Sequence, residues 1–193
     1  MSHPAVFAVV LAAGAGSRFG AQKLVQEYRG AALVRRAMGL AEAACGERSV
    51  LVTGHAWKAV FDASGPLRGF LVLNNGYREG IASSIVSGVR AVRHVADAIL
   101  LLLADQPLVT AAHLRTVLAR WEASREVIVA TAFSGTAGPP ALLPAHYFDR
   151  LLALRGDRGA RAIIAGAGAR LRTVPFGPAA VDVDRPDDLV KLP

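Results

Sequence analysis

The chain has 193 residues, of which 53% are hydrophobic, and a formal net charge of +7. This is enough for one domain with a sizeable core, and the basic residues are scattered, which argues against nucleic-acid binding. A single cysteine, Cys45, excludes an intrachain disulfide, and no apolar run approaches the ~20 residues of a membrane-spanning helix. Without a signal-peptide pattern, we expect one domain over residues 1–193, in the cytoplasm, with no nucleic-acid or membrane partner.

Short apolar runs alternate with segments of helical periodicity. They predict strands at 6–11, 49–53, 69–73, 98–103 and 127–131, and helices at 33–44, 81–92 and 111–121. The later chain predicts a short apolar piece at 139–143, helices at 145–154 and 160–164, closing strands at 171–174 and 181–183, and a last helix from Pro186. The alternation predicts an α/β fold with three layers: a mostly parallel, twisted sheet with helices on both faces.

A glycine-rich loop follows the first predicted strand. Residues 12–23 read Ala-Ala-Gly-Ala-Gly-Ser-Arg-Phe-Gly-Ala-Gln-Lys. Glycine lets a ligand approach the main chain, and the free N–H groups of such a loop form an anion-binding concavity. Arg18 and Lys23 add fixed positive charge beside it. We interpret the loop as a phosphate cradle.

Other glycine-loop motifs fit this stretch less well. The dinucleotide fingerprint expects an acid near the end of the second strand, where the chain has Thr53-Gly54-His55. A Walker loop expects Ser or Thr after its lysine, where the chain has Leu24. An ordinary strand–helix turn is the remaining alternative, but such turns are short and need no charges.

Two acidic sites complement the loop. Asp105 follows the most apolar strand, and the carboxyl ends of parallel strands share one edge of a sheet. Because Thr110 can cap the next helix, we expect Asp105 to bind Mg²⁺, which prefers one or two carboxylates together with phosphate oxygens and water. Asp182 and Asp184 stand two apart on a predicted strand, so they would face the same cation. Capping of the following helix by Asp184 is the alternative.

The segment 74–85 follows the third strand and opens a helix. It reads Asn-Asn-Gly-Tyr-Arg-Glu-Gly-Ile-Ala-Ser-Ser-Ile. Small polar side chains and free N–H groups at a helix N-terminus suit recognition of a base edge or a ribose. A plain cap with small-residue packing of the helix is the alternative. The five histidines show no ligand spacing, so no zinc site is expected.

Taken in order, these motifs resemble those of the molybdenum-cofactor (molybdopterin) cytidylyltransferases, within the MobA-like nucleotidyltransferases. The matching positions are Leu11-Ala-Ala-Gly-x-Gly-x-Arg-x-Gly-x-x-Lys23, Ser84-x-x-x-Gly88, Asp105-Gln-Pro, Gly138-x-Pro140, Gly156-Asp-x-Gly-Ala-Arg161 and Asp182-x-Asp184-x-Pro-x-Asp-Leu. They cover nearly the whole chain.

The resemblance implies a Mg²⁺-dependent enzyme that transfers CMP from CTP to molybdopterin with release of pyrophosphate, with a molybdoenzyme or its chaperone as a possible protein partner. It implies catalytic roles for Lys23, Arg18 and Asp105, and metal binding by Asp105 with Asp182 or Asp184. It assigns nucleotide binding to Leu11, Ala12, Ala13, Gly14, Gly16, Ser17, Arg18, Lys23, Ser84 and Gly88. It assigns acceptor binding to Gly138, Pro140, Asp157 and Arg161.

The identity of the nucleotide and of the acceptor is indicated by fewer residues than the nucleotidyl-transfer reaction itself. Ala12-Ala13-Gly14 resembles the form of CTP users, whereas guanylyl relatives resemble Ala-Gly-Gly. The chain departs from the family at Ala104, where glycine is usual, at Ala82 and at 29–32. Three alternatives therefore stay open: a sugar or polyol phosphate as acceptor, a GTP-dependent reaction, or a non-catalytic accessory role in molybdoenzyme assembly.

Overall fold

The structure is a computed structural model and describes residues 4–14 and 22–193. Within these residues, seven strands form a mixed sheet in the order β5-β4-β1-β6-β8-β7-β9. The strands are β1 (Val6–Ala12), β4 (Ser49–Thr53), β5 (Phe70–Leu73), β6 (Ala98–Leu103), β7 (Ile128–Phe133), β8 (Thr136–Pro144) and β9 (Leu171–Pro175). Only β8 pairs antiparallel, with β6 and β7, so the predicted mostly parallel α/β fold is confirmed.

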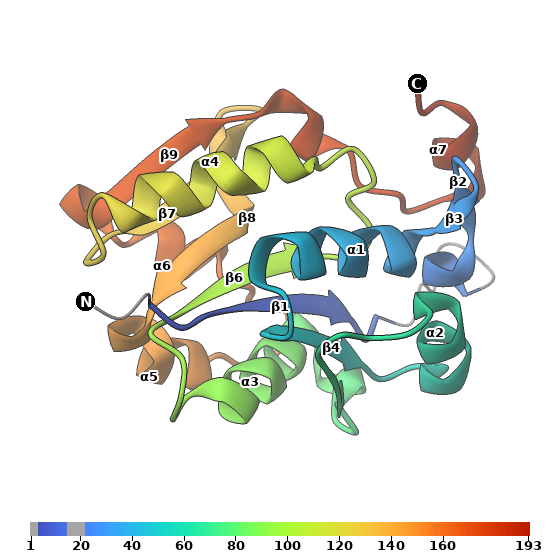
Figure 1. The fold of residues 1–193 in the computed structure, drawn as a ribbon, viewed down its shortest axis with the longest axis horizontal. Coiled ribbons are helices and arrows are strands. Elements are labelled where there is room, and N and C mark those ends of the chain that lie inside the picture. The colour runs from blue at the N-terminus through green and yellow to red at the C-terminus, as the bar shows by residue number, and fades with distance from the viewer. Residues whose placement is uncertain (1–3, 15–21) are drawn as a thin grey trace.

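Helices cover both faces of this sheet (Figure 1). One layer holds α1 (Leu33–Cys45), α2 (Trp57–Ser64) and α4 (Ala111–Glu122), and the other holds α3 (Ile81–Val92), α5 (Phe148–Leu152) and α6 (Arg161–Ala165). Successive side chains of a strand point to opposite faces, so Val10 packs in the α1 layer and its neighbours Val9 and Leu11 in the α3 layer. The apolar run of β1 is therefore buried on both sides.

Short elements complete the chain and bring its end back to its beginning. They are the hairpin of β2 (Glu27–Tyr28) and β3 (Ala31–Ala32), helix α7 (Pro186–Val190), and 3₁₀ turns at Lys23–Val25, Tyr77–Glu79, Ala145–Tyr147, Gly168–Arg170 and Gly177–Ala180. Tyr28 Oη and Arg29 Nη2 donate to the carbonyl of Pro193 at 2.5 and 2.7 Å. These bonds fasten the C-terminal segment beside β2 and β3, where Figure 1 shows α7.

The strand order reverses beside β1. The chain runs outward from β1 through β4 to β5 and then returns to β6 on the other side of β1. Such a reversal leaves a crevice at the carboxyl ends of the two central strands. Since β1 leads into the glycine loop and β6 leads into Asp105, the topology itself directs both toward one crevice.

The structure differs from the sequence-based expectations mainly at its edges. The five predicted strands and three long helices are confirmed within two residues, but α2, the β2–β3 hairpin and the full length of β8 were not predicted. The predicted strand at 181–183 is wrong, because these residues have no regular structure and Val183 makes a single backbone bond to Asp105 instead of joining a ladder. Within the described residues, no helix has the length and apolar character needed to cross a bilayer.

Candidate active site

The side chain of Lys23 meets carboxylates from two distant parts of the chain. Its Nζ lies 2.7 Å from Asp105 Oδ2 and 3.3 Å from Asp184 Oδ1. Burial alone would lower the pKa of Lys23, but the charges and hydrogen bonds of Asp105 and Asp184 outweigh it and raise this pKa above its usual value. Lys23 is therefore a charged ammonium at neutral pH, at the point where the end of the glycine loop, the end of β6 and the C-terminal tail converge.

Asp182 is the third carboxyl group of this site. Burial in the first place, and the negative charge of Asp105 in the second, raise its pKa to about 6, although a side-chain hydrogen bond with Gln106 and, to a lesser degree, the charge of Arg161 act in the opposite direction. Its Oδ1 is buried and has no hydrogen-bond partner among the described residues. A buried carboxylate oxygen without a donor is costly unless a cation approaches it.

These carboxylates fit a divalent cation that shares its ligands with a substrate. In the part of the chain that the structure describes, no three His, Cys, Asp or Glu side chains gather into a complete metal site. Mg²⁺ does not require such a cluster, because it binds through one or two carboxylates and takes its other ligands from phosphates and water. The unpartnered oxygen of Asp182, beside Asp105, is the feature that favours a cation here.

Asp182 and Asp184 converge on this site for a different reason from the predicted one. They do not alternate on a strand; their segment is held by the Val183 N–H, which donates to the carbonyl of Asp105 at 3.0 Å. Asp188 Oδ2 accepts the N–H groups of Asp184 and Arg185 at 2.9 and 2.8 Å. The N-cap residue of α7 is Arg185 rather than Asp184.

Gln106 fixes the same tail from the other side, and the sequence analysis assigned it no role of its own. Its Nε2 donates to the carbonyls of Ala179 at 2.8 Å and Pro139 at 3.4 Å. A buried polar side chain needs such partners. The sequence did offer one indication of this role: Gln106 directly follows Asp105, a candidate metal ligand, at the end of a buried strand.

A cavity of about 650 Å³ opens beside Asp105 at the carboxyl ends of β1, β4 and β6. This volume is typical of small-molecule sites. The cavity is lined by Leu11, Ala13, Gly14, His55, Tyr77, Arg78, Gly80, Ile81, Ser84, Leu103, Asp105 and Asp157. The end of the first strand and the start of α3, both expected to contact a nucleotide, thus share one cavity.

Most predicted nucleotide-binding residues that the structure describes lie at this cavity. Leu11, Ala13, Gly14 and Ser84 line it, and Lys23 contacts Asp105 in its wall. Ala12, in contrast, points into the core on the α1 side of the sheet. The predicted nucleotide-binding residues Gly16, Ser17 and Arg18 lie outside the described residues.

Gly88 lies away from the cavity, on the buried face of α3. A Cβ at this position would stand 2.5 Å from Val9 Cγ1 and 3.2 Å from Val52 Cγ2. The absent side chain lets α3 pack closely against β1 and β4. Gly88 therefore matches the small-residue packing alternative rather than a direct contact with a nucleotide.

The four predicted acceptor-site residues divide between different places. Asp157 lines the first cavity. Arg161 at the start of α6 lies over the ring of Phe133, 6.0 Å from its centroid, in the wall of a second cavity of about 850 Å³. Gly138 lies against Arg161, since a Cβ there would stand 3.4 Å from Arg161 Nε. Pro140 is buried and lines neither cavity.

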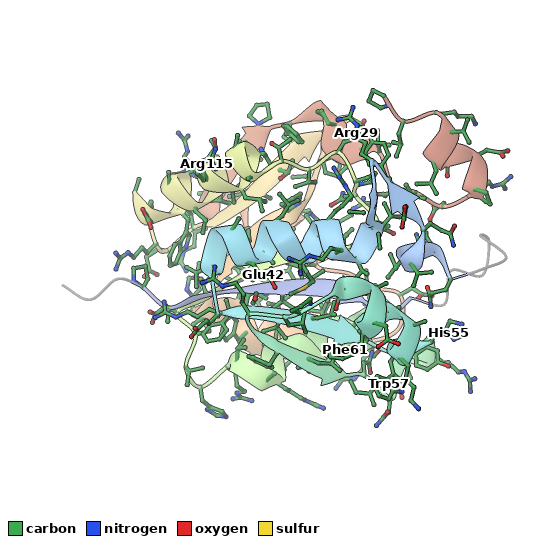
Figure 2. The ribbon with its side chains drawn as sticks, turned by 45° about the vertical axis from the view of Figure 1, so that its right-hand side comes forward. Arg29, Glu42, His55, Trp57, Phe61 and Arg115 are labelled. Atoms are coloured by element: carbon green, nitrogen blue, oxygen red, sulfur yellow. The ribbon has the colours of Figure 1, made fainter. Side chains whose placement is uncertain are left out.

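His55 and Tyr77 also line the first cavity, and the sequence analysis gave His55 no role. Their rings lie 5.8 Å apart and tilted by 51°, and the His55 N–H donates to the carbonyl of Ala13 at 3.3 Å. Figure 2 shows His55 at the same end of the molecule as Trp57 at the start of α2. His55 follows β4, the neighbour of β1 in the sheet. Because ligands gather at the carboxyl ends of such strands, this position could have identified His55 as a residue of the cavity.

Comparison with known proteins agrees with this geometry. Residues 8–174 match the MobA-like NTP transferase domain. The purine catabolism protein PucB of Bacillus subtilis (strain 168) is 30% identical over 97% of this chain and 96% of its own length. The nicotine blue oxidoreductase of Paenarthrobacter nicotinovorans is 31% identical over 83% of this chain and 82% of its own length.

A solved structure shares the whole architecture. Rv0371c from Mycobacterium tuberculosis H37Rv superposes with a TM-score of 0.86 at 27% identity, over 99% of this chain and 98% of that protein. A second structure of Rv0371c, in complex with manganese, superposes with a TM-score of 0.82 at 26% identity, over 98% of both chains. With the family match spanning the glycine loop and Asp105, the chain belongs to the MobA-like NTP transferase family and is a nucleotidyltransferase.

Proposed function

We propose that this nucleotidyltransferase is a Mg²⁺-dependent cytidylyltransferase that transfers CMP from CTP to molybdopterin and releases pyrophosphate. The observation that carries the proposal is the contact of Lys23 Nζ with Asp105 Oδ2 at 2.7 Å, beside a cavity lined by Ala13 and Gly14. A triphosphate with its cation needs positive charge for its oxygens and carboxylates for the metal, and both stand here at the end of the central strands.

In the proposed reaction, a phosphate oxygen of the acceptor attacks the α-phosphorus of CTP in line. The bond between the α-phosphorus and the oxygen that bridges to the β-phosphate breaks, and pyrophosphate leaves. Lys23, held as an ammonium, would bind the triphosphate and stabilise the leaving group, together with Arg18. The contribution of the chain is therefore positioning and charge stabilisation rather than covalent chemistry.

Asp105, with Asp182 or Asp184, would hold the divalent cation. When bound, Mg²⁺ neutralises phosphate charge and orients the reacting groups. The buried Oδ1 of Asp182 and the raised pKa of this carboxyl support the assignment, because a cation would stabilise the ionised form that burial disfavours. The manganese complex of Rv0371c supports a divalent cation in this fold.

The preference for CTP over GTP rests on Ala13. Ala13 is 2% exposed and lines the cavity, and a Cβ at Gly54 would stand 3.0 Å from the Ala13 methyl group. The methyl group thus fills space between the end of β1 and the end of β4. A filled wall here favours the smaller pyrimidine over a purine.

The acceptor assignment rests on Arg161. Arg161 lines the second cavity, and its positive charge acts on the carboxyl group of Asp182. A phosphate on the acceptor would bind Arg161 and present an oxygen to the site. Molybdopterin carries such a phosphate, and the second cavity has room for the remainder of a small molecule.

The test is an assay of pyrophosphate release. The protein is incubated with Mg²⁺, molybdopterin and one of CTP, GTP, ATP or UTP, and the expected result is release with CTP. Release only with GTP would overturn the cytidylyl assignment, and release only with a sugar or polyol phosphate would overturn the acceptor. Nucleotide binding without release from any acceptor would favour the accessory role.

A further inference from the structure

The C-terminal segment, residues 181–193, carries Asp182 and Asp184 to the active site. The structure describes all of these residues, and none of them joins a strand ladder. Asp184 nevertheless stands 3.3 Å from the ammonium of Lys23, and Asp182 lies close enough to Asp105 for their charges to interact. The position of the two carboxylates therefore depends on whatever holds this segment against the rest of the fold.

A small apolar cluster, separate from the two cores of the sheet, packs the C-terminal segment against the β2–β3 hairpin, where Figure 1 shows α7. Its buried members are Tyr28, Leu33 and Val183, at most 8% exposed, and the partly buried Leu108, Leu189 and Leu192 pack against them. Helix α7 turns Leu189 toward the cluster, whereas its neighbour Val190 is 85% exposed. Apolar burial thus holds the segment, and Tyr28 is the member that the hairpin contributes.

Tyr28 holds the C-terminal segment with its polar end as well as with its ring. A buried tyrosine hydroxyl needs a hydrogen-bond partner, and here Oη donates to the carbonyl of Pro193 at 2.5 Å, beside Arg29 Nη2 at 2.7 Å. The guanidinium groups of Arg29 and Arg36 lie 5.2 and 4.9 Å from the centroid of the Tyr28 ring. These cation–π contacts fix the ring in the orientation in which its hydroxyl reaches the segment.

The hairpin that carries Tyr28 also follows the phosphate-binding lysine. Tyr28 comes five residues after Lys23 in the sequence, and the Leu33 N–H closes the base of the hairpin by donating to the carbonyl of Gln26 at 2.9 Å. One short, ordered piece of chain thus contacts Asp184 through Lys23 and the remainder of the C-terminal segment through Tyr28.

A cluster of this size can open without unfolding the sheet. Regions with few buried apolar contacts open locally at a cost far below that of global unfolding. The Val183 N–H donates to the carbonyl of Asp105 at 3.0 Å and would be released in such an opening. Opening would carry Asp182 and Asp184 away from Lys23 while β1 and β6 stay paired. The population of the docked segment therefore sets how often these groups meet.

We propose that Tyr28 is a positioning residue for the cation site: it docks the C-terminal segment on the hairpin and so brings Asp182 and Asp184 to Asp105. The inference rests on the proposed function, which places a divalent cation at these carboxylates. Tyr28 acts through the carboxylates and does not itself contact the cation. A cation that binds the docked form stabilises docking, and docking raises the apparent affinity for the cation in return.

The first measurement is amide hydrogen exchange of the whole chain without ligand, read by mass spectrometry. Tyr28→Phe removes the hydroxyl and keeps the ring, so residues 181–193 should exchange about 5-fold faster, the scale of one hydrogen bond, while β1 and β6 keep their protection. Leu189→Ala should accelerate the same residues on the order of 10-fold or more. The controls are Tyr147→Phe, buried elsewhere in the fold, and Val190→Ala, exposed on α7, and neither should change this exchange.

The second measurement is the affinity for Mn²⁺ in the presence of CTP, from the relaxation enhancement of water protons. Tyr28→Ala removes ring and hydroxyl together and should weaken Mn²⁺ binding on the order of 10-fold, because the docked form becomes a minor population. Tyr28→Phe should restore most of the affinity. The double variant Tyr28→Ala with Leu189→Ala should bind Mn²⁺ no more weakly than Tyr28→Ala, since both substitutions act on the same docking. In the wild-type protein, Mn²⁺ with CTP should slow the exchange of residues 181–193.

The outcomes separate this inference from the function on which it rests. If Tyr28→Ala accelerates exchange of the C-terminal segment but binds Mn²⁺ as tightly as the wild-type protein, or if it leaves that exchange unchanged, the inference is overturned and the proposed function stands. If the wild-type protein binds no Mn²⁺ with CTP, the proposed function fails and the positioning role fails with it. Should circular dichroism show that Tyr28→Ala does not fold, Leu189→Ala against Val190→Ala decides the same question.

Discussion

Lys23 and Asp105 are 82 residues apart in the sequence, and their charged atoms lie 2.7 Å apart in the structure. The contact arises because β1 and β6 are parallel neighbours whose carboxyl ends meet at the reversal of the strand order. The tail then adds Asp184, 3.3 Å from the same ammonium. A cationic group and its carboxylates are thus held at the place where a triphosphate and its metal would bind.

Replacing Lys23 by methionine keeps most of its bulk and removes the charge. We expect kcat for pyrophosphate release to fall on the order of 10²-fold or more at saturating CTP, because charge stabilisation of the leaving group is lost. Lys58→Met is the control, since Lys58 lies exposed on α2. Full turnover of the Lys23 variant at saturating nucleotide would refute the assignment.

Asp182 should make the metal-free protein less stable at neutral pH. Its folded-state pKa of about 6 exceeds the usual 3.8, so the native state binds the proton more tightly than the unfolded state does. Stability contributed by this group is present below pH 3.8 and falls as the pH rises to about 6. We expect Asp182→Asn to stabilise the metal-free protein at pH 7.5 by about 1 kcal/mol, a value reduced for partial solvent exposure, and by nothing at pH 3.5.

The same variant should also respond less to divalent cations. Mg²⁺ or Mn²⁺ with CTP is expected to raise the melting temperature of the wild-type protein, because a ligand that binds only the native state stabilises it. Asp105→Asn and Asp182→Asn should reduce this rise, whereas Asp187→Asn, an exposed position in α7, should not. Equal shifts in all four proteins, measured by scanning fluorimetry, would argue against metal binding by these carboxylates.

Ala13 provides a separate test of nucleotide choice. Removing its methyl group with Ala13→Gly opens the wall between the ends of β1 and β4, so the penalty against a purine should fall. We expect the ratio of kcat/KM for CTP to that for GTP to drop about 10-fold, the scale on which pockets discriminate by single methyl groups. An unchanged ratio would show that this methyl group does not face the base.

The central strands and the crevice between them could be predicted because their signals are local. Val6–Ala12 and Ala98–Leu103 are apolar on both faces, and the charged residues Lys23 and Asp105 follow them. Asp182 and Asp184 do lie near Lys23 and Asp105, as expected, but not because they alternate on a strand. Their segment is held by Gln106 and the carbonyl of Asp105, which are long-range contacts without a periodic signal in the sequence.

Other parts of the site had no local signal of that kind. His55 belongs to the cavity only because β4 lies beside β1, so its role depends on strand order. Asp157 and Arg161 stand four residues apart, yet they line different cavities. Gly88 matches the Ser-x-x-x-Gly spacing of the family. In the structure this glycine lets α3 pack closely against Val9, a role that the spacing alone does not reveal.

Gly88 should therefore be sensitive in stability rather than in nucleotide binding. A methyl group 2.5 Å from Val9 Cγ1 overpacks the contact between α3 and β1, so we expect Gly88→Ala to destabilise the protein by about 1–3 kcal/mol in urea unfolding. The affinity of the folded variant for CTP should stay within about 2-fold of wild type, unlike the roughly 10-fold loss expected for a lost hydrogen bond. Gly39→Ala is the control, since nothing lies within 4 Å of a Cβ on Gly39 in α1, and it should be neutral or stabilising.

His113 should make the fold sensitive to mild acid. It is 5% exposed, with its ring stacked on Phe176 at 4.3 Å and its Nε2 2.7 Å from Thr131 Oγ1. Because the Thr131 hydroxyl donates to the carbonyl of Pro140, Nε2 must donate to Thr131. Burial lowers the pKa of His113 below the usual 6.5.

The sign of the pH dependence follows from this lowered pKa. As the pH falls through 6.5, the unfolded state gains a proton on His113 that the native state resists, so stability is lost with acidification. We expect the free energy of unfolding to decrease between pH 7.5 and pH 5 more steeply in the wild-type protein than in His113→Gln, which keeps a donor for Thr131 but cannot titrate. His94→Gln, at an exposed position after α3, should retain the wild-type slope. Parallel slopes for the wild-type protein and His113→Gln in urea titrations would show that the acid sensitivity arises elsewhere.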